Sequence, residues 1–415
     1  MSRSPRLGRA ASYWTAAAVA VIALWTSGAP STSYPLYAEL WHLSPIVTTA
    51  IFGTYPLTLV LTLLATGSLS DHIGRRGAIL LGVAGMLVGT SLFAIAGNVV
   101  LLFLGRAVLG IGVGLALSPA SAAVLEYSKP SSRRIAASVT TAATALGVTM
   151  STLVGGALVQ YGPLPLALDY WVLAAVIVGV GVFAWFLPRN PAASHDHGWR
   201  PAISLSVPPR QRLIFVTAAL SSSIAYMTGG IFLALGASIA RQLVHTDNTL
   251  VIGALLALMF VTVGVTAVLA RRVGPRLSMR IGGAMTGVAF VLLASSALLQ
   301  SLPVFVLTAL TAGIAYASAF SGGLGYVSVH APASHRASVI SALYLAAYGA
   351  QGLIAVALGL TATFIGLFAA VLIGSAVMTV LGITTVVLTL IRRHREGAPT
   401  TRSLLVSPGG NQPTM

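Results

Sequence analysis

The sequence predicts an all-α integral membrane protein of about twelve transmembrane helices, and three observations carry that prediction. The composition is 56% hydrophobic and only 7% charged, with a mean hydropathy of +0.92. A water-soluble domain carries roughly 25% charged residues, because its surface must be solvated. The apolar runs reach the roughly 20 residues that a helix needs to cross a bilayer. They lack the alternating segments, each about ten residues long, that are typical of membrane β-barrels, so the spans are predicted to be helices.

The apolar runs follow one another along the chain, and each is long enough to be a membrane span. Six precede residue 188, at 12–37, 44–66, 77–97, 99–127, 133–160 and 164–187. Six follow residue 211, at 212–241, 248–270, 279–299, 302–330, 336–360 and 362–391. The equal halves predict two six-helix bundles.

A polar segment between the halves is rich in Pro, Gly, Ser and charged residues, as linkers are. We therefore expect an N-terminal bundle at 1–187, a cytoplasmic linker at 188–211 and a C-terminal bundle at 212–395. The polar end of the chain, 396–415, is predicted to be a disordered cytoplasmic tail. The halves also resemble each other weakly, because SSRRIAAS near residue 131 is echoed by SHRASVIS near residue 334. Repeated six-span units are frequent in secondary transporters.

The formal charge of +16 is distributed as in membrane proteins. With a cytoplasmic N-terminus, all of the 23 Lys and Arg residues except Arg106 and Arg241 fall on the cytoplasmic side of the spans. Both termini are therefore predicted to be cytoplasmic, in a multi-pass protein of the cell membrane. The charge gives no indication of nucleic-acid binding.

Neither an enzyme nor a cofactor protein is predicted. The chain has no cysteine, which excludes disulfides and thiolate metal sites. We find no arrangement of nucleophile, base and acid. His195, Asp196 and His197 lie in the linker without a fourth ligand nearby, so we interpret them as part of a solvated loop and expect no metal.

A charged motif, GSLSDHIGRRG, fills the short gap between the second and third spans. Its glycines permit a tight turn, and its aspartate lies where the dipole of the third helix favours an anion. Its arginines lie within reach of a glutamate at the inner end of the fourth span, if these helices are neighbours. The alternative, a topology signal alone, accounts for the arginines but not for the aspartate or the glycine spacing. The predicted inner-gate residues are Gly67, Asp71, Gly74, Arg75, Arg76 and Glu126.

The stretch 67–76 resembles the loop 2–3 signature of the major facilitator superfamily, G-x-L-[AS]-D-x-x-G-R-[KR]. A second stretch, R106-A-V-L-G110-I-G112, is similar to the R-x-x-x-G-x-G element of that family. The resemblance implies the major facilitator fold and alternating access, in which two bundles rock about a central site and the charges of the motif form an inner gate. It also implies a protein that acts as a monomer.

Arg106 is a charged residue within a predicted span, where an unpaired charge costs several kcal/mol. It should therefore face the interior of the bundle, with Asp169 or Glu39 as a partner. In family members this arginine is associated with proton coupling or with the charge of the substrate, so the resemblance implies such a role for these three residues. The alternatives are a structural buried pair and an arginine that snorkels outward.

The fifth span carries G147-V-T-M-S151-T152-L-V-G155-G156, which resembles the G-x-x-x-G-P-x-x-G-G element of drug–proton antiporters of the family. Ser151 and Thr152 replace its central Gly-Pro, which weakens the inference of antiport and leaves helix packing as the favoured role. The predicted packing residues are Gly110, Gly112, Gly147, Ser151, Gly155 and Gly156.

Polar and aromatic side chains in other spans are candidates for a substrate cavity. Pro30 removes one backbone donor and is predicted to bend the first helix toward its outer end. Interhelical hydrogen bonding is the commoner role of polar and aromatic side chains within membrane spans. The cavity candidates are Trp25, Ser221, Tyr226, Tyr344, Tyr348 and Gln351.

These features predict secondary active transport of a small organic solute across the lipid bilayer. Proton-coupled efflux of amphipathic compounds is the favoured form. The alternative is proton-coupled uptake, or uniport, of a nutrient such as an organic anion or a sugar. It is favoured by the lack of a carboxylate at mid-membrane and by Arg106 as the deep charge.

Overall fold

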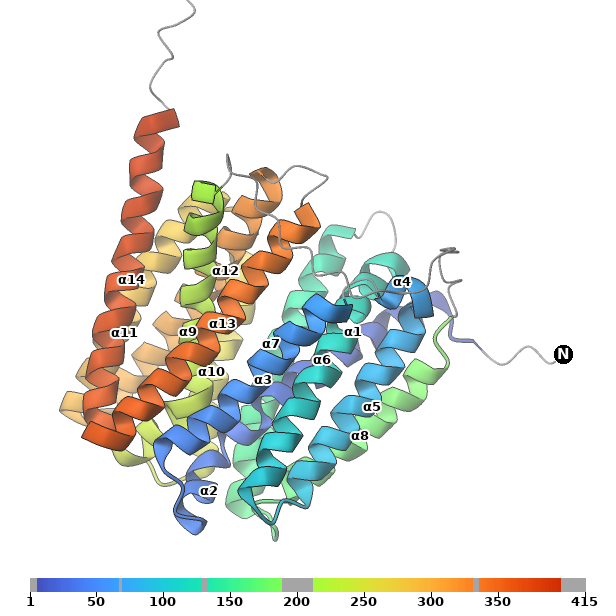
Figure 1. The fold of residues 1–415 in the computed structure, drawn as a ribbon, viewed down its shortest axis with the longest axis horizontal. Helices are drawn as coiled ribbons and strands as arrows, with labels where there is room; N and C mark the ends of the chain where they lie inside the picture. Colours follow the sequence, from blue (N-terminus) through green and yellow to red (C-terminus); the bar gives the residue numbers. More distant parts are fainter. Residues whose placement is uncertain (1–5, 67–68, 129–132, 189–211, 331–335, 397–415) are drawn as a thin grey trace, which may run out of the picture.

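A computed structural model describes residues 6–66, 69–128, 133–188, 212–330 and 336–396, without the side chains of 70–71, 133–138, 336–337 and 392–396. In this part of the chain every regular element is a helix, and 12 helical segments are long and apolar enough to cross a membrane. Figure 1 shows them as two bundles side by side, the first half of the chain beside the second. The predicted fold class is confirmed.

The helix bounds are as follows. The N-terminal bundle contains α1 (Arg9–Gly28), α3 (Pro45–Thr66), α5 (Arg75–Ala94), α6 (Val99–Tyr127), α7 (Arg133–Tyr161) and α8 (Leu168–Trp185). The C-terminal bundle contains α9 (Arg212–Gln242), α10 (Thr249–Leu269), α11 (Pro275–Leu299), α12 (Leu302–His330), α13 (Arg336–Ile365) and α14 (Leu367–Glu396). The shorter elements are η1 (Ala29–Ser31), α2 (Tyr34–Leu40), α4 (Leu69–Ile73) and η4 (Ala270–Arg272).

Local sequence accounts for two helix boundaries, the one that follows α1 and the one between α13 and α14. Pro30 is predicted to bend the first helix, and the structure has a break there: α1 ends at Gly28, and a 3-10 turn containing Pro30 follows before α2 begins. The turn between α13 and α14 lies at Gly366, about five residues beyond the predicted position. Gly366 has φ +90°, a conformation that glycine adopts without steric cost. The domain boundaries stay predictions, because 189–211 and 397–415 lie outside the described residues.

Burial separates central from peripheral helices. In an 18-residue stretch of α9, 94% of the residues are buried, against 33% for α8 and α14. The outer helices present large exposed apolar side chains such as Val380 and Ile383. A surface of this kind is typical of contact with lipid.

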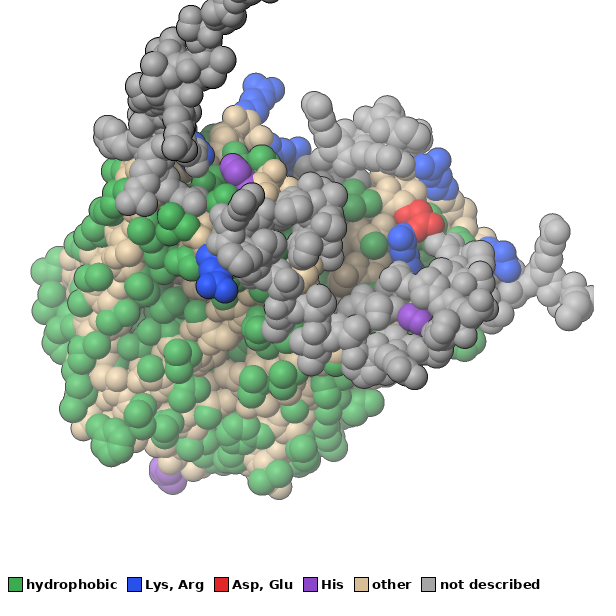
Figure 2. Space-filling model, turned by 45° about the horizontal axis from the view of Figure 1, so that its top comes forward, with side chains coloured by type: hydrophobic (Ala, Val, Ile, Leu, Met, Phe, Trp, Pro, Cys, Tyr) green, Lys and Arg blue, Asp and Glu red, His purple; other side chains and the backbone are tan. Residues whose placement is uncertain are grey.

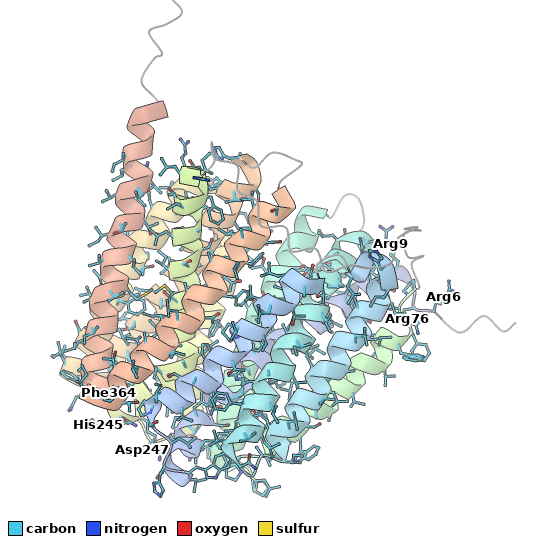
Figure 3. The ribbon with its side chains drawn as sticks, in the orientation of Figure 1. Arg6, Arg9, Arg76, His245, Asp247 and Phe364 are labelled. Atoms are coloured by element: carbon cyan, nitrogen blue, oxygen red, sulfur yellow. The ribbon has the colours of Figure 1, made fainter. Side chains whose placement is uncertain are left out.

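The two ends of the bundles differ in charge. One of them, called here the arginine-rich end, carries Arg9, Arg75, Arg76, Arg212, Arg271 and Arg272 at helix termini. Figure 2 shows Lys and Arg side chains gathered on this end. Figure 3 shows Arg6, Arg9 and Arg76 there, and His245 and Asp247 at the opposite end.

The bundles contact each other at the opposite end. Glu39 on α2 forms an ion pair with Arg241 on α9, with 3.0 Å between Oε2 and Nη2. The backbone N–H of Thr249 donates to Gln160 Oε1 at 2.7 Å, and that of Ile46 donates to Thr363 Oγ1 at 3.0 Å. Each of these contacts joins a residue of the first six spans to a residue of the last six.

Close helix packing seals the same end. A Cβ atom at Gly156 on α7 would lie 2.7 Å from the carbonyl oxygen of Thr249, and one at Gly253 on α10 would overlap the carbonyl oxygen of Thr152. Real Cβ atoms do not approach this closely, so α7 and α10 meet here through glycine alone. The described conformation is therefore closed at the end opposite the arginines.

Candidate functional site

Arg106 lies on α6 in the interior of the N-terminal bundle, with none of its surface exposed. Its Nη1 donates to the carbonyl oxygen of Ser27 at 2.8 Å. Its Nε and Nη2 donate to the Tyr34 hydroxyl at 2.8 and 2.5 Å. Both acceptors come from the broken first span, so the break at Pro30 helps to hold the arginine.

Four aromatic rings surround the same guanidinium group. The centroids of Tyr34, Phe52, Tyr55 and Phe93 lie 5.5, 5.7, 5.6 and 6.0 Å from Arg106 Cζ. Ring faces attract cations, most strongly where water is excluded. Aromatic quadrupoles and neutral oxygens therefore stabilise this charge.

The carboxylate partners expected for Arg106 are not its partners in this conformation. Glu39 pairs with Arg241 instead, at the surface. Asp169, at the start of α8, is 1% exposed and has no hydrogen-bond partner among the described residues. Sequence spacing placed these groups at similar depth, but it could not say toward which neighbour each side chain points.

Asp169 lies among buried polar side chains at the closed end. Its Oδ2 is 3.2 Å from the point where a Cβ on Gly155 would stand, and Thr32 Oγ1 is 3.0 Å from the same point. Both oxygens therefore lie against Gly155, a position on α7 that carries no side chain. The hydroxyl of Thr32 is also buried without a partner among the described residues, and the buried hydroxyls of Ser33 and Tyr170 lie close enough to interact with each other. We call Thr32, Ser33, Asp169 and Tyr170 the Asp169 cluster.

Aromatic residues of α9, α12 and α13 form a second cluster, called here the aromatic cluster. The Tyr226 ring centroid lies 4.6 Å from that of Tyr348, 5.4 Å from Phe320 and 6.0 Å from Tyr316. Tyr344 joins at 6.2 Å from Phe320 and 6.3 Å from Tyr348. The predicted tyrosines are thus brought together, along with two residues that the prediction missed. The missed signal was the i, i+4 spacing of Tyr316 and Phe320 on α12.

The aromatic cluster faces the N-terminal bundle through Tyr55. This residue of α3 lies close enough to the phenol groups of Tyr316 and Tyr348 to interact with them electrostatically. Because Tyr55 is also one of the four rings around Arg106, it lies between the two sites. Gln351, 9% exposed, adds an amide oxygen without a partner among the described residues.

The other two cavity candidates have different surroundings. Ser221 on α9 is wholly buried and donates to the carbonyl oxygen of Ala319 on α12 at 2.8 Å, so it bonds one helix to another. Trp25 is 8% exposed, and its Nε1 has no partner among the described residues.

The charged motif is partly described. Arg75, at the start of α5, forms an ion pair with Glu126 near the end of α6. The Arg76 guanidinium lies 5.3 Å from the ring centroid of Trp185 on α8. Gly74, which precedes α5, has φ +78°, which explains why glycine is needed at this turn. Gly67 and the side chain of Asp71 lie outside the described residues.

Comparison with known families tests the resemblance carried by these motifs. A family model described as Major Facilitator Superfamily matches residues 16–351, which include Arg106, the Asp169 cluster and the aromatic cluster. The chain belongs to the Major Facilitator Superfamily. The twelve candidate spans of the described residues, arranged in two bundles, are those expected of a transporter of this superfamily.

Relatives within the superfamily differ in what they carry. A segment of 154 residues is 32% identical to the multidrug efflux pump LfrA of Mycolicibacterium smegmatis, and it covers 36% of this chain and 30% of that protein. Another of 133 residues is 35% identical to the proton myo-inositol cotransporter of Homo sapiens, covering 31% of this chain and 20% of that protein. The matched segments thus span less than a third of either relative.

Solved structures of the superfamily share the fold at low identity. The peptide transporter POT in complex with sulfate has a TM-score of 0.73 at 16% identity, covering 94% of this chain and 96% of that one. A bacterial homolog to the human lysosomal transporter Spinster, in an inward-facing and unoccupied conformation, has a TM-score of 0.70 at 17% identity, covering 92% and 95%. At these identities the likeness shows the fold.

The small residues of this superfamily member lie where helices approach closely. A Cβ at Gly110 would lie 2.6 Å from the carbonyl oxygen of Tyr55, and one at Gly112 would lie 2.6 Å from the backbone nitrogen of Met86. A Cβ at Gly147 would lie 3.1 Å from the backbone nitrogen of Trp25, while Ser151 packs against Gly28. Contact with three different helices, α3, α5 and α1, supports the packing role expected for these positions.

Proposed function

We propose that the chain exports amphipathic compounds in exchange for protons, by alternating access between its two bundles. In this proposal the protein spans the plasma membrane with its arginine-rich end toward the cytoplasm, an orientation that the positive-inside rule supports. The observation that carries the coupling is the Asp169 carboxylate, which is 1% exposed and without a hydrogen-bond partner among the described residues.

Asp169 supplies the proton-binding group in this mechanism. An ionised carboxylate buried without a donor is far more costly than a neutral carboxylic acid, so burial in the closed conformation favours the protonated form. When the end opposite the arginine-rich end opens, water reaches the carboxylate and stabilises its charge. Proton uptake from that side and closure of that end therefore favour each other. The exchange is completed when an exported compound binds from the arginine-rich end and the proton is released toward that end.

The aromatic cluster supplies the substrate surface. Its members are uncharged, and flat ring faces bind lipophilic groups and amphipathic cations without specific hydrogen bonds. Tyr55 contributes from the other bundle, so an occupant between them contacts both halves of the transporter. The likeness to a multidrug efflux pump supports this substrate class.

Proton-coupled uptake of a sugar is the second candidate. The Gln351 amide oxygen and the tyrosine hydroxyls suit a polyol, and the likeness to a proton myo-inositol cotransporter supports it. An organic anion fits less well, because Arg106 is wholly buried beneath four rings and its donors already bind Tyr34 and Ser27.

Proteoliposomes that contain a pH-sensitive dye test the proposal. Lipophilic cations, neutral drugs, organic anions and sugars are added under an imposed proton gradient. We expect drug-dependent proton flux in the unmodified protein and in the control Asp247→Asn, which removes an exposed carboxylate at the same end. Asp169→Asn should abolish proton flux but retain exchange of labelled drug for unlabelled drug. Proton flux that survives in Asp169→Asn would contradict coupling at this site, and flux with sugars alone would establish the second candidate.

The Arg75–Glu126 ion pair is proposed to form part of the inner gate. Both side chains are more than a third exposed, at 38% and 37%, and exposed ion pairs contribute about 0.2–1 kcal/mol. Glu126→Gln should therefore lower thermal stability only slightly, while changing the rate of drug-dependent proton flux. Arg212→Gln, an exposed change at the same end, is the control. A loss of several kcal/mol in unfolding free energy would show that the pair stabilises the fold and is not a gate.

A further inference from the structure

A groove runs along the lateral surface of the protein between α7 and α10, one helix from each bundle. Its volume is about 390 Å³. It lies in the half nearer the arginine-rich end, because α7 begins and α10 ends there. Its lining residues are Ala142, Ala145, Leu146, Thr149, Val261, Gly264, Val265, Val268 and Leu269.

The lining of the groove is apolar. The hydroxyl of Thr149 already donates to the carbonyl oxygen of Ala145 at 2.8 Å, so it has no proton left to donate to an occupant. The helices meet at the floor, where a Cβ at Gly264 would lie 3.1 Å from Ala145 Cβ. The walls remain open, with Leu146 and Val265 49% and 53% exposed. Such a groove, at membrane depth, suits a hydrocarbon chain.

A positive charge lies where the groove ends. Leu269 is the last residue of α10, and the turn η4 follows it with Arg271 and Arg272, both exposed. Arg272 follows the lining residue Leu269 by three positions across the 3-10 turn η4, the spacing at which side chains of such a turn share one side. Guanidinium groups bind phosphate oxygens in a fork, and basic sites beside membrane spans attract anionic headgroups.

We propose that this groove binds an anionic phospholipid of the leaflet at the arginine-rich end. One acyl chain lies between α7 and α10, and Arg271 and Arg272 hold the phosphate of the headgroup. Because the walls belong to different bundles, the bound lipid joins the two halves near their arginine-rich ends. The lipid therefore stabilises the relative position of the bundles, whatever substrate the transporter carries.

Fluorescence quenching can test the location directly, since the chain has no cysteine. A bimane label at Val265→Cys is placed in vesicles that contain phosphatidylglycerol or phosphatidylcholine with a doxyl group on the acyl chain. The matched control is Ile383→Cys on α14, which is 56% exposed against 53% for Val265. We expect doxyl-phosphatidylglycerol to quench the label at Val265 at least twofold more than doxyl-phosphatidylcholine, and both lipids to quench equally at Ile383.

Two pairs of charge substitutions and the addition of inorganic phosphate distinguish a lipid headgroup at these arginines from a free anion. Arg271→Gln with Arg272→Gln should equalise the two lipids at Val265, whereas Arg6→Gln with Arg212→Gln, the same loss of charge elsewhere at that end, should not. Adding inorganic phosphate should leave quenching unchanged if the ligand is the lipid; strong competition by phosphate would mean that a free anion occupies the arginines. Equal quenching by both lipids at Val265 in the unmodified protein would overturn the proposal.

Discussion

Gly253→Val is expected to prevent the protein from closing at the end opposite the arginines. Even the Cβ atom of valine would overlap the carbonyl oxygen of Thr152, which is backbone and cannot turn aside. Overpacking of this kind costs about 1–3 kcal/mol. The open state makes no such contact, so the ratio of closed to open molecules should fall about 5- to 150-fold.

The distance between spin labels on the two bundles measures this change. Leu164→Cys and Leu299→Cys introduce exposed sites at the closed end, one in each half of the chain. The distribution of distances should shift toward longer values in Gly253→Val. Gly349→Val is the control, because no heavy atom lies within 4 Å of its Cβ position. An unchanged distribution in Gly253→Val would mean that α7 and α10 do not seal this end.

Arg106→Met is expected to abolish transport, because the family resemblance implies a role in coupling or substrate charge for this arginine, while lowering the free energy of unfolding by only about 1–3 kcal/mol. The wholly buried charge has only neutral hydrogen-bond partners, and the removal of a desolvated charge offsets the loss of its bonds. What remains is an unpaired Tyr34 hydroxyl, which costs about 1–3 kcal/mol. Adding Tyr34→Phe removes that hydroxyl, so the double variant should unfold at a higher temperature than Arg106→Met alone.

Thermal unfolding in one detergent, together with drug-dependent proton flux, measures both effects. Arg106→Lys keeps the charge but loses the two bonds from Nε and Nη2 to one oxygen, so it should be less stable than the double variant. Phe103→Leu, a half-buried neighbour on α6, serves as a control for general disturbance of the helix. Full transport by Arg106→Met would show that the arginine is structural, against the role expected for it.

Features that depend on a few adjacent residues could be predicted from the sequence. Span length and hydropathy indicated the membrane helices, because a bilayer requires an apolar run of fixed length. Pro30 predicted a bend in the first span, since proline lacks the N–H that a continuous helix needs, and the helix is interrupted there. The proximity of Arg75 and Glu126 was predicted on the condition that their helices are neighbours, and α5 and α6 do pack side by side in the structure.

Only the tertiary structure decided which side chains meet inside the bundles. Arg106 binds Tyr34, 72 positions away, and Asp169 has no partner among the described residues, although depth alone made the two a plausible pair. Tyr316 and Phe320 join Tyr226 from another helix, and the lateral groove exists only because α7 and α10 lie side by side. The physical reason is that hydropathy fixes the depth of a residue in the membrane, whereas close packing of helices fixes the direction in which it points.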